Sequence, residues 1–282
     1  MLEGRASRTA EHNALFRALE TRRPGALFED PLAERFLGPT LRAVARLGRP
    51  ASRVIDRRWP GVRSSVVART RLIDDVVAGV APVVDQVVLL GAGFDTRSYR
   101  LPCLTERAVF EVDHPDTQRR KREVLRRAGV PHDHVRFVAT DFNLGELGGA
   151  LATAGYDPAV PTLLLWEGVT NYLDAAAVDA GLRWCAGAAP GSALLLTYVD
   201  RQVLDHPDRY VGAKQLHSTL HRAGEALTFG MAPAAMPGYL AGVGLRLEWD
   251  LGAADYRLLA YGDAALRMRG HEFYRVALAH VG

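Results

Sequence analysis

The sequence has few cysteines, almost no lysine and no long apolar run. Cys103 and Cys185 are the two cysteines, and their spacing fits neither a disulfide framework nor a metal site. Both adjoin apolar segments, which predicts buried free thiols. No apolar stretch is long enough to span a membrane, and the first residues, MLEGRASRTAEHN, lack the apolar core of a secretory signal. We therefore expect a cytoplasmic protein that does not bind membranes.

Positive charge is carried almost entirely by arginine, and it is not concentrated in one stretch. Of the 35 basic residues only Lys121 and Lys214 are lysine, and 32 acidic residues lie among the arginines, so the net charge is +3. A nucleic-acid-binding domain usually concentrates its basic residues on one face. The sequence therefore predicts no nucleic-acid partner, although a weak basic bias in the first seventy residues fits an anionic ligand.

The first 80 residues have the apolar spacing of helices. Apolar residues recur at helical intervals at Ala14, Leu15, Ala18 and Leu19. Asp30 is a good N-cap for a short helix over 31–37, because Pro31 suits the first helical position. A longer helix is predicted over 62–80. We interpret residues 1–80 as a helical cap over the following sheet.

From residue 81 onward, strands alternate with helical stretches. This alternation predicts an α/β fold with a doubly wound, mostly parallel sheet of seven strands over residues 81–282. Prolines interrupt the stretch from about 200 to 240, which we expect to form a lid or substrate insertion. The predicted strands are 87–90, 108–112, 135–139, 162–166, 193–198, 245–251 and, antiparallel beside the fifth, 273–280.

The first of these strands ends at Gly91-Ala92-Gly93. Glycines let the backbone turn tightly and approach a ligand without a Cβ in the way, although many such turns are only structural. In open α/β sheets the ligand binds at the carboxyl ends of the strands, so this turn is the predicted floor of a cofactor site. Thr96 stands where a dinucleotide motif has its third glycine, which favours a nucleoside cofactor without a pyrophosphate.

Acidic residues follow three other strands, and parallel strand ends meet at one edge of a sheet. Asp113 lies about twenty residues beyond the glycines, where an acid accepts hydrogen bonds from both ribose hydroxyls; alternatively it caps the next helix. Asp141 is placed to accept from an adenine amino group with Phe142 against the ring, or is only a turn former. Glu167 directly follows an apolar strand, which favours a functional role.

Several motifs in this order resemble the leucine carboxyl methyltransferase-like (PPM/LCM) family of S-adenosyl-L-methionine (SAM)-dependent enzymes. The resemblance covers about residues 10–200 and implies a Rossmann-like class I methyltransferase fold with SAM as cofactor. A later segment, LTFGMAPAAMPGYLAGVGLRL, is similar to bacterial tetracenomycin-type polyketide O-methyltransferases, which act on natural-product acids. The family-like motifs are RALE, LFEDPLAERFL, VVARTRLIDD, LLGAGFDTRSYRL, FEVDHP, TDF and WEGVTNYL.

The resemblance implies roles for individual residues. A guanidinium pairs well with a carboxylate, and Arg69 is implied to bind the methionine carboxylate of SAM. Arg17 lies near a family position that also reaches the cofactor, or is a solvated arginine; Tyr172 is implied to lie on the substrate side, or is a tyrosine at the edge of the core. The implied cofactor contacts are the methionine portion for Gly91, with Gly93 in the same turn, the ribose for Asp113, the adenine for Asp141 and Phe142, and the methionine amino group or sulfonium for Glu167.

The predicted function is O-methylation of a carboxylate on a small molecule of secondary metabolism. A carboxylate is ionised at neutral pH and needs no base, whereas a phenol needs a nearby proton acceptor. The strand ends offer no base that cofactor binding does not already use. His206, His217 and His221 in the lid could serve a phenol, so hydroxyl methylation stays an alternative.

Other functions fit the sequence less well. A nicotinamide-dependent reductase is disfavoured by Thr96 and by the lack of a clear Tyr-x-x-x-Lys pair. Methylation of a protein C-terminus or of tRNA is a further alternative, and the small net charge argues against RNA. His132-Asp133-His134 is interpreted as a polar turn with no metal, because adjacent residues in a loop do not converge on one ion. The oligomeric state is left open.

Overall fold

The computed structural model of the chain describes residues 8–140, 147–223 and 226–282. Its centre is a seven-stranded sheet in the order β3-β2-β1-β4-β5-β7-β6. The first five strands are parallel, and β7 lies antiparallel between β5 and β6. The strands are β1 Gln86–Leu90, β2 Ala108–Asp113, β3 Val135–Ala139, β4 Thr162–Trp166, β5 Ala193–Val199, β6 Leu245–Gly252 and β7 Tyr274–Val281.

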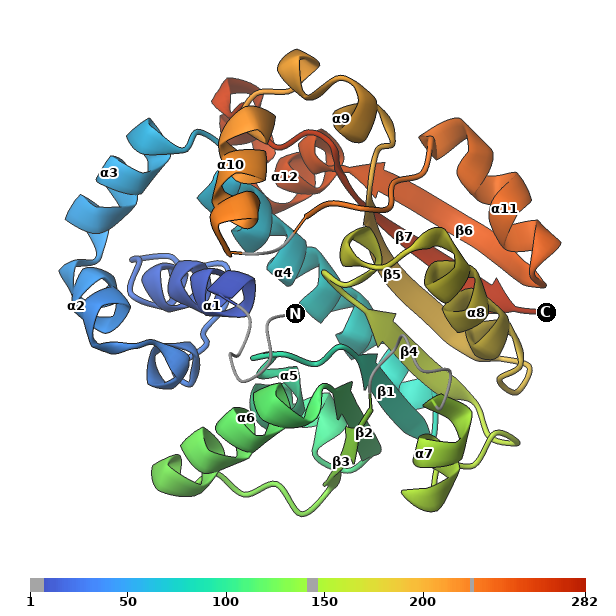
Figure 1. Ribbon diagram of the computed structural model, residues 1–282. Coiled ribbons are helices and arrows are strands. Elements are labelled where there is room, and N and C mark those ends of the chain that lie inside the picture. The colour runs from blue at the N-terminus through green and yellow to red at the C-terminus, as the bar shows by residue number, and fades with distance from the viewer. Residues whose placement is uncertain (1–7, 141–146, 224–225) are drawn as a thin grey trace.

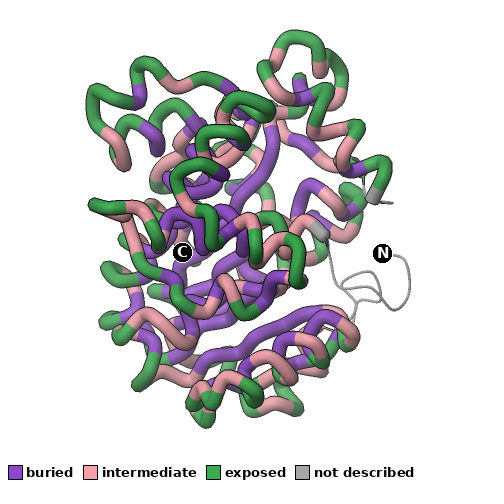
Figure 2. Tube along the Cα trace, turned by 90° about the vertical axis from the view of Figure 1, so that its left-hand side faces the viewer, coloured by how far each residue is buried: buried purple, intermediate pink, exposed green. Residues whose placement is uncertain are grey.

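Helices cover both faces of this sheet (Figure 1), which confirms the predicted doubly wound α/β fold. The strands are apolar on both sides: in β1, Val88 and Leu90 face one apolar layer, while Val87 and Leu89 face the other. Figure 2 shows the buried chain gathered along the strands. After the N-terminal segment the helices are α5 Arg97–Arg100, α6 Pro115–Ala128, α7 Leu147–Thr153, α8 Ala175–Ala186, α9 Gln202–Asp205, α10 Ala213–Ala223, α11 Met236–Gly242 and α12 Ala253–Tyr261.

The N-terminal segment is helical and lies beside the sheet (Figure 1). Many of its apolar residues form a separate cluster, which includes Phe36 stacked on Phe94 from the turn after β1, with ring centroids 4.8 Å apart. Ala68, Ile73 and Val77 instead pack in the layer on one face of the sheet. The helix predicted over 62–80 is confirmed. The helices of this segment are α1 Arg8–Thr21, α2 Pro39–Leu47, α3 Arg49–Arg58 and α4 Val62–Val80.

The helix predicted over 31–37 is wrong in length and type. The structure has a single 3-10 turn, η1 Ala33–Phe36. The Asp30 side chain still accepts a hydrogen bond from the backbone N–H of Ala33 at 3.0 Å. This carboxylate is also bonded to groups on other elements, so the local cap is only part of its role. The other 3-10 turns are η2 Ala81–Val83, η3 Pro102–Leu104, η5 Thr170–Tyr172, η6 Pro207–Arg209, η7 Pro233–Ala235 and η8 Gly262–Arg267.

The stretch from 200 to 240 divides into two parts. Residues of α11, including Met236 and Leu240, are buried in the apolar layer that also contains residues of α7 and α8. The segment before α11 is joined to the end of β5, because the backbone N–H of Met231 donates to the Val199 carbonyl at 3.0 Å. Before this junction, the backbone N–H of Thr228 donates to the carbonyl of Asn171, beyond the end of β4, at 2.9 Å.

Both cysteines are free thiols, as predicted; Cys185 is buried and Cys103 partly buried. Burial raises the pKa of both thiols. Within the described residues, no helix combines the length and apolar character needed to cross a membrane.

One of the two lysines lies inside the fold. Lys121 on α6 forms an ion pair with Glu111 on β2, with 2.7 Å between Nζ and Oε2, and both side chains are at most 1% exposed. Ser98 donates a hydrogen bond to the other Glu111 oxygen at 2.8 Å. Burial raises the pKa of Glu111, while Lys121 acts in the opposite direction. The pair therefore allows a carboxylate in the centre of a strand.

Replacement of Lys121 by methionine should destabilise the fold by about 3–5 kcal/mol, because it leaves a buried carboxylate without a counter-charge. Lys214 on α10 is exposed and gives a matched control: Lys214→Met should change the free energy of unfolding by no more than about 0.5 kcal/mol. Urea unfolding monitored by circular dichroism measures both. Equal stabilities for the two variants would contradict this account of the pair.

Candidate functional site

A cavity of about 590 Å³ opens at the carboxyl ends of β1, β2 and β4. This is the point where the strand order reverses, on either side of β1. A cavity of a size that fits small ligands therefore lies where the ligand site was predicted. Its lining includes Asn13 and Arg17 from α1, Val66, Arg69 and Thr70 from α4, and the predicted residues Gly91, Gly93, Asp113, Glu167 and Tyr172.

The glycine turn forms one side of this cavity. Gly91 and Gly93 have φ values of +72° and +46°, which L side chains rarely adopt. A Cβ on Gly91 would lie 2.3 Å from a methyl carbon of Val169. Glycine is therefore required at position 91 both by the turn and by the neighbouring loop after β4.

Thr96, at the position of the third glycine of the dinucleotide motif, makes a contact that a glycine could not make. Its hydroxyl donates a hydrogen bond at 2.7 Å to Asp30, whose carboxylate also accepts from Arg17 Nε at 2.8 Å. The residue at this position therefore joins the loop after β1 to the N-terminal helical segment. A glycine would leave the buried Asp30 carboxylate with one donor fewer.

Asp113 is 8% exposed and lines the cavity at the end of β2. One carboxylate oxygen accepts from the backbone N–H of His114 at 2.7 Å, and the other accepts from the backbone N–H of Gly93. Burial raises the pKa of Asp113, against the effect of these two donors. The alternative of a helix cap is wrong: the His114 side chain caps α6, through Nδ1 and the backbone N–H of Asp116.

Glu167 and Arg69 come together at the other end of the cavity. Arg69 Nε donates to Glu167 Oε1 at 2.8 Å, joining α4 to the end of β4. The Arg69 guanidinium also lies over the Tyr274 ring, 5.6 Å from its centroid. Within the described residues neither Nη atom of Arg69 has a hydrogen-bond partner. One edge of the guanidinium is therefore left for another acceptor.

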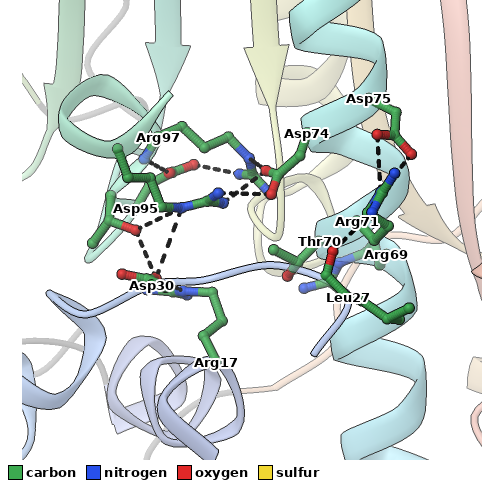
Figure 3. Close-up of polar contacts among 12 residues, drawn as sticks. Arg17, Leu27, Asp30, Arg69, Thr70, Arg71, Asp74, Asp75, Asp95 and Arg97 are labelled. Atoms are coloured by element: carbon green, nitrogen blue, oxygen red, sulfur yellow. Dashed lines mark hydrogen bonds and ion pairs between the residues drawn. The ribbon is translucent and has the colours of Figure 1, made fainter. Parts of the chain in front are cut away.

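Arg97 is a site residue that the sequence analysis did not identify. Its Nε donates to Asp74 at 2.8 Å, and its Nη1 donates to Asp95 at 2.5 Å and to Glu167 Oε2 at 2.7 Å. Figure 3 shows Arg97 between Asp95 and Asp74. Asp74 also binds Arg100 through both oxygens, at 2.7 Å each. The DTRSYR motif contained these arginines, but their partner on α4 cannot be found by spacing.

Arg17 is buried, so the alternative of a solvated arginine is wrong. Besides its bond to Asp30, it donates from Nη2 to the Phe94 carbonyl at 2.6 Å. Arg17 therefore contacts the loop after β1, and it also lines the cavity.

Among the described residues, five uncharged ones line another part of the cavity: Val169, Tyr172, Leu173, Ala226 and Thr228. Tyr172 lies in η5 and lines the cavity. Thr228 bonds the residues on either side of it: the backbone N–H of Thr228 donates to the Asn171 carbonyl at 2.9 Å, and the Thr228 hydroxyl donates to the Leu173 carbonyl at 2.7 Å. Ala226 and Thr228 belong to the predicted lid. Among the described lining residues, His114 is the only histidine, so His206, His217 and His221 are not part of the wall.

Two sequence predictions concern other positions. Asp141 and Phe142 lie outside the described residues; Thr117 and Thr140 line the cavity near the end of β3. The histidines of the His132-Asp133-His134 turn interact with separate backbone carbonyls, those of Val130 and Ser98.

The family model for leucine carboxyl methyltransferase matches residues 10–186. A Frankia alni protein named as an S-adenosyl-L-methionine-dependent methyltransferase is 40% identical over 200 residues, which cover 70% of each chain. A Streptomyces coelicolor protein with the same kind of name is 33% identical over 263 residues, covering 84% of this chain and 92% of the relative.

Two solved structures share the fold. A DUF574 family protein from Streptomyces avermitilis superimposes with a TM-score of 0.64 at 14% identity and 100% coverage of both chains. A Thermobifida fusca protein named as a methyltransferase has a TM-score of 0.63 at 17% identity, covering 95% of this chain and 94% of that one. At these identities the comparison supports the class I methyltransferase fold.

The ion pairs at the site should make stability depend on acid pH. Burial acts to raise the pKa of Asp95, but Arg97 and Lys121 outweigh it and hold this pKa at about 2. Burial likewise acts to raise the pKa of Glu167, and Arg97 and Arg69 hold it below its ordinary value. An acid whose pKa is lowered by folding stabilises the folded state at any pH above its ordinary pKa of about 4. This stabilisation is lost as the pH falls through the lowered pKa of the folded state.

Asp95→Asn should therefore be less stable than the native chain at pH 7, and this difference should shrink as the pH falls from about 4 toward 2. Urea unfolding at a series of pH values measures it. Asp75→Asn is the control, since the Asp75 side chain is 56% exposed and its pair with Arg71 should contribute no more than about 1 kcal/mol. A difference for Asp95→Asn that does not change with pH would contradict the assignment.

Proposed function

The chain belongs to the leucine carboxyl methyltransferase family, and on this premise we propose that it methylates a carboxylate of a small molecule, of the polyketide-like or another secondary-metabolite class. The chain is a SAM-dependent methyltransferase, so the alternative prediction of a nicotinamide-dependent reductase is wrong. The proposal assigns the cofactor to the strand-end cavity, beneath a cap of residues 1–80, and the acceptor to the uncharged end beside the 200–240 insertion. It also places the reaction in the cytoplasm.

The residues around the cavity fit the parts of SAM. Asp113 uses one lone pair of each oxygen on a backbone N–H, and a carboxylate has about four acceptor positions, so two are left for the ribose hydroxyls. Arg69 offers its Nη edge to the methionine carboxylate, and Glu167 offers a negative charge to the amino group. Asp141 and Phe142 are proposed for the adenine. Arg17, which lines the cavity and donates to the Phe94 carbonyl, is proposed as a further cofactor contact.

The observation that favours a carboxylate is that the described residues at the acceptor end include no base. These residues are Val169, Tyr172, Leu173, Ala226 and Thr228. A tyrosine ordinarily keeps its proton at neutral pH, and the other four side chains do not ionise. An acceptor that is already ionised suits this wall, whereas a phenol would need a group to take its proton.

Bound SAM would supply a methyl group that is already activated by its positively charged sulfur. That methyl group would pass to the acceptor oxygen with the electron pair of the carbon–sulfur bond staying on sulfur, so an ionised acceptor would need no proton transfer. The protein's task is alignment and exclusion of water, which are the main contributions of proximity catalysis. Tyr172 is the side chain proposed to orient the acceptor, and Thr228 fixes the backbone on both sides of it.

The ribose assignment predicts that Asp113→Ala weakens binding of SAM and of its demethylated product, S-adenosylhomocysteine. The expected loss is about 10- to 100-fold, because two hydrogen bonds to a charged group disappear. Asp179→Ala on α8 is the control, since Asp179 pairs with Arg183 on the outer face of that helix. Titration calorimetry measures both. Native affinity in a folded Asp113→Ala variant would contradict the ribose role.

The carboxylate assignment predicts the chemistry of the product. A panel of hydroxybenzoic and related hydroxyaromatic acids offers both nucleophiles in one molecule, and labelled SAM marks the product. Mild alkali should release the label as methanol, because methyl esters hydrolyse and aryl methyl ethers do not. A label that resists alkali would overturn the carboxylate proposal in favour of hydroxyl methylation.

A further inference from the structure

We infer that Arg97 is a positioning residue for the amino group of the cofactor, because it fixes the Glu167 carboxylate at the methionine end of the cavity. The inference rests on the proposed function, in which Glu167 accepts from that amino group. Arg97 acts through Glu167 rather than through the reacting atoms.

Glu167 is fixed from two sides. Arg69 Nε donates to Oε1 at 2.8 Å, and Arg97 Nη1 donates to Oε2 at 2.7 Å. The Glu167 side chain is 16% exposed, so part of the carboxylate still faces the cavity that it lines. Two donors on different oxygens determine the plane of the carboxylate, and each oxygen keeps a lone pair for a further donor.

Arg97 is itself immobilised. Its side chain is 4% exposed and is bonded to Asp74 on α4 as well as to Asp95 in its own loop. The backbone N–H of Arg97 also donates to Asp95, at 2.8 Å, so one carboxylate holds both the main chain and the side chain. The guanidinium therefore joins Asp95 in the loop after β1, Asp74 on α4 and Glu167 at the end of β4. Figure 3 shows its contacts with the first two.

The charges around Glu167 balance before any ligand is considered. Three arginines, Arg69, Arg97 and Arg100, face three carboxylates, those of Asp74, Asp95 and Glu167. The amino-acid part of SAM adds one positive and one negative charge, so this balance is kept when the ammonium meets Glu167 and the carboxylate meets Arg69. Loss of Arg97 would leave an excess of negative charge in a buried site.

The two arginines have different relations to Glu167. Both arginines line the cavity, but they are bonded differently: Arg69 keeps one edge of its guanidinium unbonded within the described residues, whereas Arg97 donates from Nε and Nη1 to three acids. Burial acts to raise the pKa of Glu167 while Arg97 and Arg69 lower it, so Arg97 also favours the ionised carboxylate that can accept from an ammonium group. A lysine cannot replace Arg97, because one ammonium does not reach acids on three segments in the geometry of a guanidinium.

The experiment compares two ligands by titration calorimetry. S-adenosylhomocysteine contains the amino-acid part, and 5′-methylthioadenosine has the same nucleoside and sulfur without it. Arg97→Lys should weaken binding of S-adenosylhomocysteine by about 10-fold or more, while binding of 5′-methylthioadenosine changes less than about twofold. Arg71→Lys, in an exposed pair on α4, is the control and should change neither affinity.

A double variant separates positioning from direct contact. If Arg97 acts through Glu167, then Arg97→Lys combined with Glu167→Gln should lose no more affinity for S-adenosylhomocysteine than Glu167→Gln alone. Additive losses would overturn the inference. If Arg97→Lys does not fold, Asp95→Asn removes one support of Arg97 and should show the same selectivity for S-adenosylhomocysteine, to a smaller extent.

The failures of the two ideas differ. A native chain that binds neither ligand would contradict the proposed function. A native chain that binds S-adenosylhomocysteine, together with an Arg97→Lys variant that weakens both ligands equally, would show a purely structural Arg97 and overturn only the inference. Unchanged affinity for both ligands in that variant would overturn it as well.

Discussion

The carboxylate of Glu167 is stable at the end of β4 because two arginines from different elements bond its two oxygens. A buried charge without such partners is costly, and this requirement extends outward. Arg97 is bonded to Asp74 and Asp95, and Asp74 also binds Arg100. Arg97 and Arg100 both lie on α5, and Thr96, just before this helix, donates to Asp30. The helical segment, the glycine turn and the sheet edge are thus connected by one set of ion pairs.

The parts of the fold that could be predicted are those with a local signal. All seven strands were predicted, and the order of strand and helix was sufficient to expect that Asp113 and Glu167 lie at one edge. The helices α2 and α3 lie in a segment that was predicted to be helical, but their separate bounds were not predicted, and in α3 polar residues outnumber apolar ones. The short helix α12 was not predicted. The turn after Asp30 was given the right cap and the wrong length.

The parts of the site that could not be predicted depend on partners distant in the sequence. Arg97 and Asp74 are 23 residues apart, and Arg97 and Glu167 are 70 apart. No spacing rule relates such positions, and a motif alone does not show which acid an arginine will meet. Thr96 illustrates the same limit: its sequence position indicated what the cofactor lacks, whereas its contact with Asp30 is a property of the fold.

The central claim is that Glu167, oriented by its two arginines, receives the amino group of the cofactor. A crystal structure with bound S-adenosylhomocysteine tests this most directly. The account predicts the ligand amino group within hydrogen-bond distance of Glu167, its carboxylate on the Nη edge of Arg69, and its ribose hydroxyls on Asp113. An amino-acid portion turned away from Glu167, with both arginine bonds of that carboxylate intact, would contradict it.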